Sequence, residues 1–173
     1  MDRDTGDDAE FDDFVAARWQ RLVRAAVLLG CSSHEAEDVV QTALTRCLVT
    51  WSRVRRADDR DAYVYRVLVN TFTDSRRRLW RGEQPTEHLP ERAVDGGDDP
   101  TRDVLVRDSV DRALARLTAD QRAAVVLRYY AHLSEAQMAS VLGVAPGTVK
   151  SRLSRALAAL ALDPDLADHE ETL

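Results

Sequence analysis

Apolar residues recur at three- and four-residue steps along most of this chain of 173 residues, and this spacing limits the fold more than any other feature. Such steps place side chains on one face of an α-helix, whereas a half-buried strand needs alternation at every second residue. We find no convincing period of two. The helical pattern covers residues 11–27, 36–51, about 62–80 and 104–117. The sequence therefore predicts an all-α fold.

Start and stop signals divide this pattern into separate helices. Gly30 ends the first one, because glycine readily adopts the left-handed backbone of a helix C-terminus. Three Ser or Thr residues precede a Glu or Gln by three positions, which is the spacing of a capping box. These pairs are Ser32 with Glu35, Thr118 with Gln121 and Ser134 with Gln137. We expect a helix to begin at each pair, and residues 52–61 to form a charged loop.

Charge separates two basic modules from acidic segments around them. The formal net charge is −6 and the pI is about 5.2, which taken alone argues against nucleic-acid binding. Residues 14–80 and 102–162, however, carry net charges of +5 and +4, and residues 81–101 combine a net charge of −4 with three glycines and three prolines. We predict an acidic tail at 1–10, a helical domain at 11–80, a flexible acidic linker at 81–101, a second helical domain at 102–162 and an acidic tail at 163–173. The acidic ends would discourage the free protein from binding random DNA.

Residues 134–160 have the pattern of a helix-turn-helix. A short helix after Ser134 ends at Gly143, and Pro146 occupies the first turn of the next helix, where its missing N–H costs no hydrogen bond. One face of that second helix is apolar and includes Leu157, whereas the opposite face and the flank are polar. The major groove of B-DNA admits such a helix. An ordinary helical hairpin with a basic rim is the alternative. The polar residues are Thr148, Lys150, Ser151, Arg152 and Arg155.

Other classes of function find little support. The longest apolar runs have seven residues, far below the roughly 20 that cross a bilayer, and the acidic first residues do not suit a secretory signal. We therefore expect a cytoplasmic protein without membrane insertion. Cys31 and His34 have ligand-like spacing, but no second Cys/His pair follows nearby. Without a Gly-rich phosphate loop or a nucleophile motif, we expect no metal, no cofactor, no catalytic residue and no enzymatic activity.

The stretch from Leu133 to Leu157 resembles the helix-turn-helix with which extracytoplasmic-function (ECF) sigma factors, of the sigma-70 family, bind the promoter −35 element. Residues 37–41, Glu-Asp-Val-Val-Gln, resemble the polymerase-binding helix of the same family, and residues 63–70, Tyr-Val-Tyr-Arg-Val-Leu-Val-Asn, resemble its −10 recognition helix. The likeness covers about residues 11–160 and is greatest to actinobacterial members of the SigE type. It implies a region 2 bundle and a region 4 helix-turn-helix, joined by a linker.

The resemblance also implies partners and contact residues. The chain would bind core RNA polymerase at the clamp coiled coil and the flap of its large subunits. Its residues Asp38 and Gln41 would contact the clamp. Asn70 would read an extruded base of the −10 element. The −35 element would be read by the five polar residues of the helix-turn-helix. Further phosphate contacts would come from Arg53, Arg55 and Arg56 on the melted strand, and from Arg76, Arg77 and Arg78 on the spacer duplex.

Three questions stay open at the level of the sequence. The chain could instead be a stand-alone helix-turn-helix regulator whose first module is a sensor or dimerisation bundle. An anti-sigma factor is a conceivable further partner. The aromatic residues Tyr65 and Phe72 could stack on unpaired bases or belong to the core, because both roles suit a large planar side chain. Tyr63 stands where the family often has Trp, and we assign it no base contact.

Overall fold

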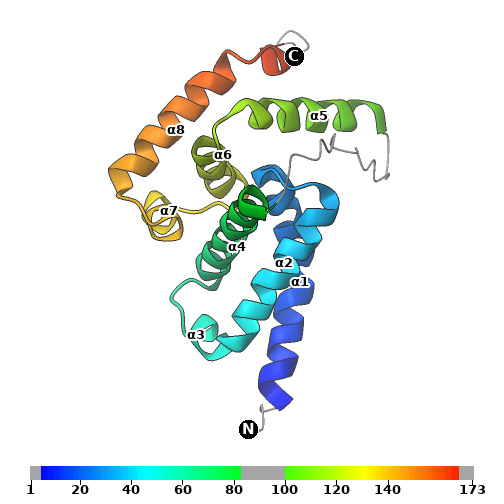
Figure 1. Cartoon of the computed structure of the whole chain (residues 1–173), viewed down its shortest axis with the longest axis vertical. Coiled ribbons are helices and arrows are strands. Elements are labelled where there is room, and N and C mark those ends of the chain that lie inside the picture. Colours follow the sequence, from blue (N-terminus) through cyan, green and yellow to red (C-terminus); the bar gives the residue numbers. More distant parts are fainter. Residues whose placement is uncertain (1–4, 83–99, 168–173) are drawn as a thin grey trace.

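The computed structural model describes residues 5–82 and 100–167, and every regular element within these ranges is helical (Figure 1). The all-α prediction is confirmed. The predicted linker lies almost entirely outside the described residues, as do positions 1–4 and 168–173 of the predicted tails. The elements are α1 (Thr5–Leu29), α2 (Ser33–Val49), α3 (Trp51–Arg55), α4 (Arg60–Gly82), α5 (Pro100–Arg116), α6 (Ala119–Val125), the π-helical turn η1 (Val126–Tyr130), α7 (Glu135–Leu142), α8 (Pro146–Ala161) and α9 (Pro164–Ala167).

The first module is a bundle in which α2 packs against both α1 and α4, while the short α3 closes one end (Figure 1). Its core contains the fully buried side chains Val40, Cys47, Val54, Val64 and Leu68. In the second module, α6 and α7 pack against α8, with Leu127, Met138 and Val149 buried between them. Both cores arise from the three- and four-residue spacing of apolar side chains.

The local start and stop signals are confirmed. In each of the three capping boxes, the hydroxyl accepts a hydrogen bond from the third residue's N–H, and that residue's side chain accepts one in return. Gly30 and Gly143 have φ angles of +115° and +64°, the left-handed backbone in which helices commonly end. Pro146 is the first residue of α8. These contacts involve neighbours in the chain, which is why spacing alone locates them.

The charged loop predicted at 52–61 is wrong in its first half, because residues 51–55 form α3. Trp51 and Val54 lie three residues apart and are both buried, so a helical turn places them on one inward face. Phe11 and Phe14 contact the indole of Trp51 edge-on, each with ring centroids 5.2 Å apart. This aromatic cluster fixes α3 beneath the first turns of α1.

Two helices extend into segments expected to be acidic tails. Helix α1 begins at Thr5, before the expected start at about residue 11, since Asp7 and Asp8 suit the positive end of its dipole. At the other end, Asp163 is buried and accepts two hydrogen bonds from Arg116 at 2.8 and 2.9 Å, and Arg112 contacts Asp165 on α9. The described acidic residues at both ends are therefore part of the folded domains.

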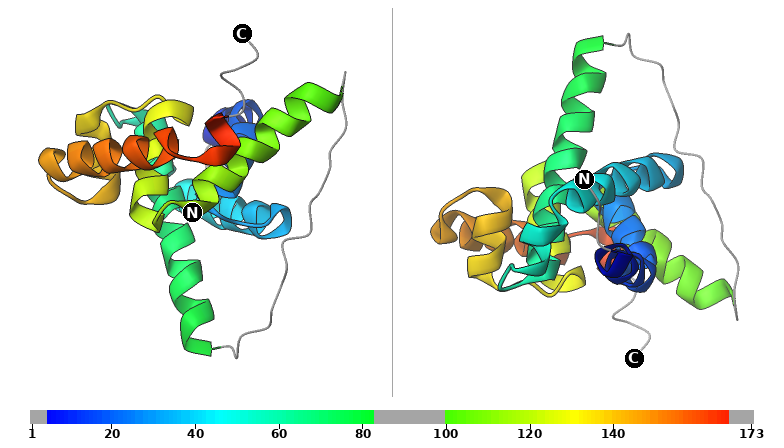
Figure 2. Two further views of the ribbon diagram at one scale, coloured as in Figure 1. Left: turned by 90° about the horizontal axis from the view of Figure 1, so that it is seen from above. Right: turned by 90° about the horizontal axis from the view of Figure 1, so that it is seen from below.

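The two modules pack against each other. Helix α1 contacts α6 and η1, and α4 contacts α7. The views from above and below show the helices of the second module close beside those of the first (Figure 2). Polar contacts border this interface: Arg21 donates to the carbonyls of Tyr130 and Ala131, both at 3.3 Å, and Gln137 donates to Asp59. One continuous apolar cluster includes residues of both modules. The protein thus forms one compact body in this state.

Candidate nucleic-acid and protein interfaces

Helix α8 turns an apolar face inward. Val149, Leu153 and Ala156 are buried, and Leu160 packs against the same cluster. The expectation that Leu157 shares this burial is wrong, because its side chain is 43% exposed. At about 100° per residue, Leu157 lies at the border of the stripe centred near Leu153, where the packing ends. The face opposite the stripe is thereby left open.

The five polar residues expected to read the −35 element differ in exposure. Thr148, Lys150 and Arg155 are exposed. Ser151 is half-buried, and its hydroxyl donates to the Thr148 carbonyl at 3.0 Å. Arg152 donates to the Asp120 carboxylate at 2.6 Å, and only 21% of its side chain is exposed. The first three are therefore directed to solvent, whereas Arg152 is tied to α6.

The arginines expected to hold the melted strand also differ in exposure and contacts. Arg53 and Arg56 are exposed, but Arg55 contacts the carboxylates of Asp7 and Glu10 on α1. Arg60 joins this group through an ion pair with Glu10 at 2.9 Å. Asn70 is exposed on α4, ten residues beyond Arg60 and therefore about 15 Å along the helix axis.

The arginine triplet at the end of α4 has one inward and two outward members. Arg77 and Arg78 are exposed. Arg76 donates to the carbonyl of Gly30, lies 3.7 Å from a Glu35 oxygen and stacks over the ring of Phe72 at 5.4 Å. Consecutive residues of a helix point about 100° apart, so three in a row cannot share one face.

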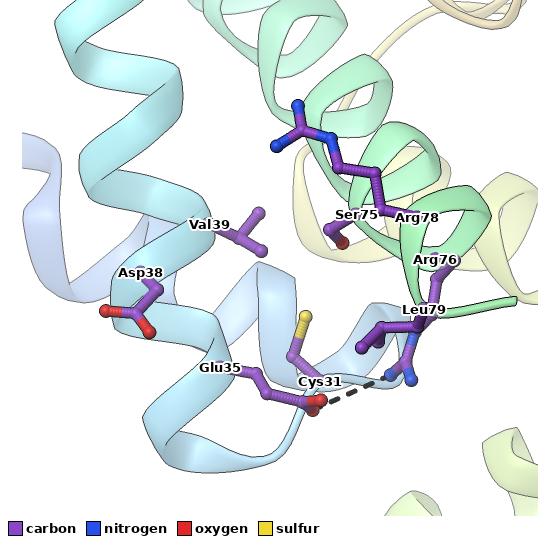
Figure 3. Close-up of a pocket in the computed structure, with 8 residues that line it drawn as sticks. All are labelled: Cys31, Glu35, Asp38, Val39, Ser75, Arg76, Arg78 and Leu79. Carbon is purple, nitrogen blue, oxygen red and sulfur yellow. Dashed lines mark ion pairs between the residues drawn. The ribbon is translucent and has the colours of Figure 1, made fainter. Parts of the chain in front are cut away.

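Asp38 and Gln41, the residues expected to bind polymerase, are exposed one turn apart on α2. Asp38 borders a cavity of about 400 Å³ between the start of α2 and the end of α4. Figure 3 shows α2 residues on one side of this cavity and α4 residues on the other, with the Arg76–Glu35 ion pair at its edge. The cavity is lined by Cys31, Glu35, Asp38, Val39, Ser75, Arg76, Arg78 and Leu79.

The open question about the aromatic side chains is settled for Tyr65, which belongs to the core with 3% exposure. Burial raises its pKa to about 12. Tyr63 and Phe72 are half-buried, with the guanidinium groups of Arg66 and Arg76 over their rings at 4.8 and 5.4 Å. Such cation–π contacts leave one ring face covered.

Sequence reasoning missed Asp7, Glu10 and Asp120 as partners of arginines that were expected to bind DNA, and it missed Arg60, which pairs with Glu10. A signal for the first two was present. Residues 7, 10, 11 and 14 share one face of a helix, so acids at 7 and 10 follow the same direction as the buried Phe11 and Phe14. For Asp120 the contact depends on how α6 crosses α8, which no local spacing reveals.

Residues 5–82 and 100–167 contain neither a membrane-spanning helix nor a metal-binding cluster. None of the helices in these ranges is long and apolar enough to span a membrane. These ranges also contain no group of three or more His, Cys, Asp or Glu side chains able to hold a metal ion.

Comparison with known proteins assigns each helical module to a family. Residues 15–82 match sigma-70 region 2, and residues 107–160 match sigma-70, region 4. The structure resembles that of the sigma factor RpoE from Bartonella quintana, solved in complex with the anti-sigma factor NepR. The TM-score is 0.74 at 27% sequence identity, covering 87% of this chain and 94% of that chain.

Curated relatives agree over nearly the whole chain. The RNA polymerase sigma-E factor of Streptomyces coelicolor is 39% identical over 155 residues, which cover 90% of this chain and 86% of the relative. The ECF RNA polymerase sigma factor SigM of Mycobacterium tuberculosis is 36% identical over 156 residues, covering 90% and 78%. With both regions present in one chain and in this order, the protein belongs to the ECF sigma factors of the sigma-70 family.

Proposed function

We propose that this sigma factor reads the −35 element with helix α8 and the −10 element with the side of the first module formed by α3 and α4. As a member of its family, the chain directs core RNA polymerase to promoters. In our proposal it acts in the cytoplasm and performs no catalytic step, because RNA synthesis belongs to the polymerase. Region 2 would occupy residues 11–80 and region 4 residues 102–162, which agrees with the two family matches.

The observation that carries the −35 assignment is the division of α8 into two faces. Val149, Leu153 and Ala156 hold the helix to its domain, and Lys150 and Arg155 extend from it into solvent. Arg155 suits a bidentate hydrogen bond to a guanine edge or a phosphate, and Lys150 suits a phosphate point contact. Thr148 and Ser151 have shorter side chains, and their hydroxyl groups would add hydrogen bonds. Arg152 would join them once it leaves Asp120.

In the first module, the exposed amide of Asn70 would read an unpaired −10 base, because it offers both a donor and an acceptor. Arg53, Arg55 and Arg56 would hold the melted strand by its phosphates. Arg77 and Arg78 would contact spacer duplex directly. Arg76, which faces the turn at Gly30, would support this surface from within.

Two protein partners complete the proposal. Asp38 and Gln41 on α2 would bind the clamp coiled coil of the polymerase, and the second module would bind the flap. An anti-sigma factor would be a further partner, by analogy with the Bartonella relative, which was solved with one.

Promoter binding would require the two modules to separate. The elements named −35 and −10 lie about 25 base pairs apart, which is about 85 Å of B-DNA at ~3.4 Å per base pair. In the compact state α7 of the second module packs directly on α4 of the first. Helices in direct contact cannot reach two sites so far apart, so we assign the compact packing to the protein away from the promoter.

Transcription with purified components tests the proposal. Core polymerase plus this protein should give start-site-specific RNA from a subset of genomic promoters, whereas core alone should not. Replacement of Asp38 and Gln41 by Ala should weaken polymerase association and leave the helical content unchanged. If no promoter in a genomic panel is used, yet the protein alone protects specific DNA, a stand-alone regulator would replace our proposal.

A further inference from the structure

Two carboxylates at the start of α1 contact an arginine at the end of α3 and another at the start of α4. Asp7 and Glu10 both contact Arg55, and Glu10 also pairs with Arg60 at 2.9 Å. All four side chains are between 35% and 39% exposed, so they lie at the surface within reach of solvent and ions. We call this group the acidic clasp. Its two positive and two negative charges cancel.

The clasp is held in place by the core beneath it. Phe11 and Phe14, on the same face of α1 as the two acids, are buried and contact the indole of Trp51 on α3. The guanidinium of Arg60 lies 6.0 Å from the centroid of that indole. Because the aromatic contacts set the position of α1 on α3, they also determine which acids meet the arginines.

The other acids in the first turns of α1 point elsewhere. Asp8, Asp12 and Asp13 are exposed on the remaining faces of the helix. General acidity of the N-terminus therefore differs from the specific contact made by Asp7 and Glu10. This difference provides a control with the same charge change on the same helix.

We propose that Asp7 and Glu10 act as internal substitutes for DNA phosphate, occupying Arg55 and Arg60 until a melted −10 strand displaces them. The inference rests on the proposed function in one respect, the role of Arg55 as a strand contact. It adds Arg60 as a second backbone contact of the strand. A carboxylate and a phosphate both accept charge-assisted hydrogen bonds from the same guanidinium donors, so the two groups compete for these donors.

This exchange makes strand binding weaker and less dependent on salt than two free arginines would make it. Each contact between a cation and a single-strand phosphate contributes about 0.7 to the slope of log affinity against log salt. An arginine that leaves a carboxylate in order to bind a phosphate causes a smaller net release of counterions than an arginine that was free before binding. Random single strands would therefore be bound weakly, and selection would depend more on contacts to the bases.

The test compares the double variant Asp7→Asn, Glu10→Gln with the control Asp8→Asn, Asp12→Asn. Each is assembled with core polymerase and titrated with the fluorescent non-template strand of a promoter at which the wild-type holoenzyme initiates. Since exposed ion pairs are weak, the clasp variant should bind about twofold to tenfold more tightly at low salt. Its salt slope should steepen by up to about 1.4. The control should show less than half of either change.

Arg60→Ala supplies a second, independent measurement. In the wild-type background, the substitution should alter strand affinity little, because Glu10 already occupies the guanidinium. In the Asp7→Asn, Glu10→Gln background it should remove about half of the gain, because Arg55 stays free to bind the strand. Thermal unfolding of every variant shows whether α1 stays docked, and Asp7→Asn alone serves if the double variant unfolds.

The outcomes separate the two proposals. Equal effects of the clasp and control variants, or unchanged affinity and salt slope in the clasp variant, would overturn the clasp and leave only a structural ion-pair cluster. Failure of the wild-type holoenzyme to bind any promoter strand would instead count against the proposed function.

Discussion

Arg24 on α1 donates two hydrogen bonds to the carboxylate of Asp111 on α5, at 2.9 and 3.2 Å, and so joins the two modules across 87 residues of sequence. The planar guanidinium fork matches both oxygens at once, which gives this pair directional specificity that a single contact lacks. It lies at the interface that must open if the modules are to reach separate promoter elements.

Replacing Arg24 by Ala should loosen the module interface with little loss of stability. The two side chains are 36% and 39% exposed, so water and salt screen the pair, and we expect a coupling free energy of about 0.2–1 kcal/mol in a double-mutant cycle with Asp111→Ala. Pulsed EPR between spin labels at Gln20 and Ser154 should show a broader distance distribution. Arg112→Ala is the control, because it removes a pair within the second module. Equal broadening in both variants would contradict the idea that the Arg24–Asp111 pair holds the two modules together.

Arg155→Ala should reduce the affinity of the holoenzyme for −35 duplex by about 1–3 kcal/mol if its exposed guanidinium makes a bidentate contact to a base. Fluorescence anisotropy with the native element and with a scrambled element measures the difference. A matching loss on both duplexes would identify a phosphate contact instead. Lys150→Ala is the comparison, with an expected salt slope shallower by about 0.9 and no change in sequence preference.

Gly143→Ala should lower the free energy of unfolding by about 1 kcal/mol, through backbone strain alone. The φ angle of Gly143 is +64°, and an added Cβ would meet no atom within 4 Å, so steric collision does not contribute. Gly147→Ala is a matched control, since its site is equally open but lies in the first turn of α8 without a positive φ. That variant should be neutral or slightly more stable. Urea denaturation measures both, and equal losses would refute the strain argument.

Cys31 and Cys47 should react with iodoacetamide at pH 8 at least about 100-fold more slowly in the native protein than in urea. Burial raises the pKa of both thiols from 9.0 to about 11, so the reactive thiolate is scarce in the folded state. The nearby Arg76 opposes this rise at Cys31 but does not outweigh burial. Mass spectrometry of time points follows both sites, with a cysteine introduced at the exposed Ser154 as the reactive control.

The same pKa shifts predict the direction in which the stability of the fold changes with pH. Between about pH 9 and pH 11 the unfolded thiols lose their protons and the native ones keep them, so the native state binds more protons there. Stability should therefore fall as the pH rises through this window. Replacing both cysteines by Ala should flatten that part of the curve, measured by urea denaturation at several pH values.

Local features of this fold were predictable because their causes are local. The capping pairs, the two left-handed glycines and Pro146 act within a few residues of one another. Helical periodicity also identified which face of α8 is buried, and it erred only at Leu157, on the border of that face. Family resemblance located the expected contact residues, but their exposure was not part of that information.

Sequence alone thus determined an all-helical chain with two basic modules, a helix-turn-helix and its membership in the sigma-70 family. Tertiary structure decided which basic residues are accessible. Arg55 meets Asp7, Arg76 meets the Gly30 carbonyl and Arg152 meets Asp120, across separations of 48, 46 and 32 residues. Each pairing depends on how one helix crosses another, and crossing geometry follows from the packing of whole apolar faces. Helical spacing indicates which face of a helix is buried, but neither spacing nor net charge indicates which helix that face meets.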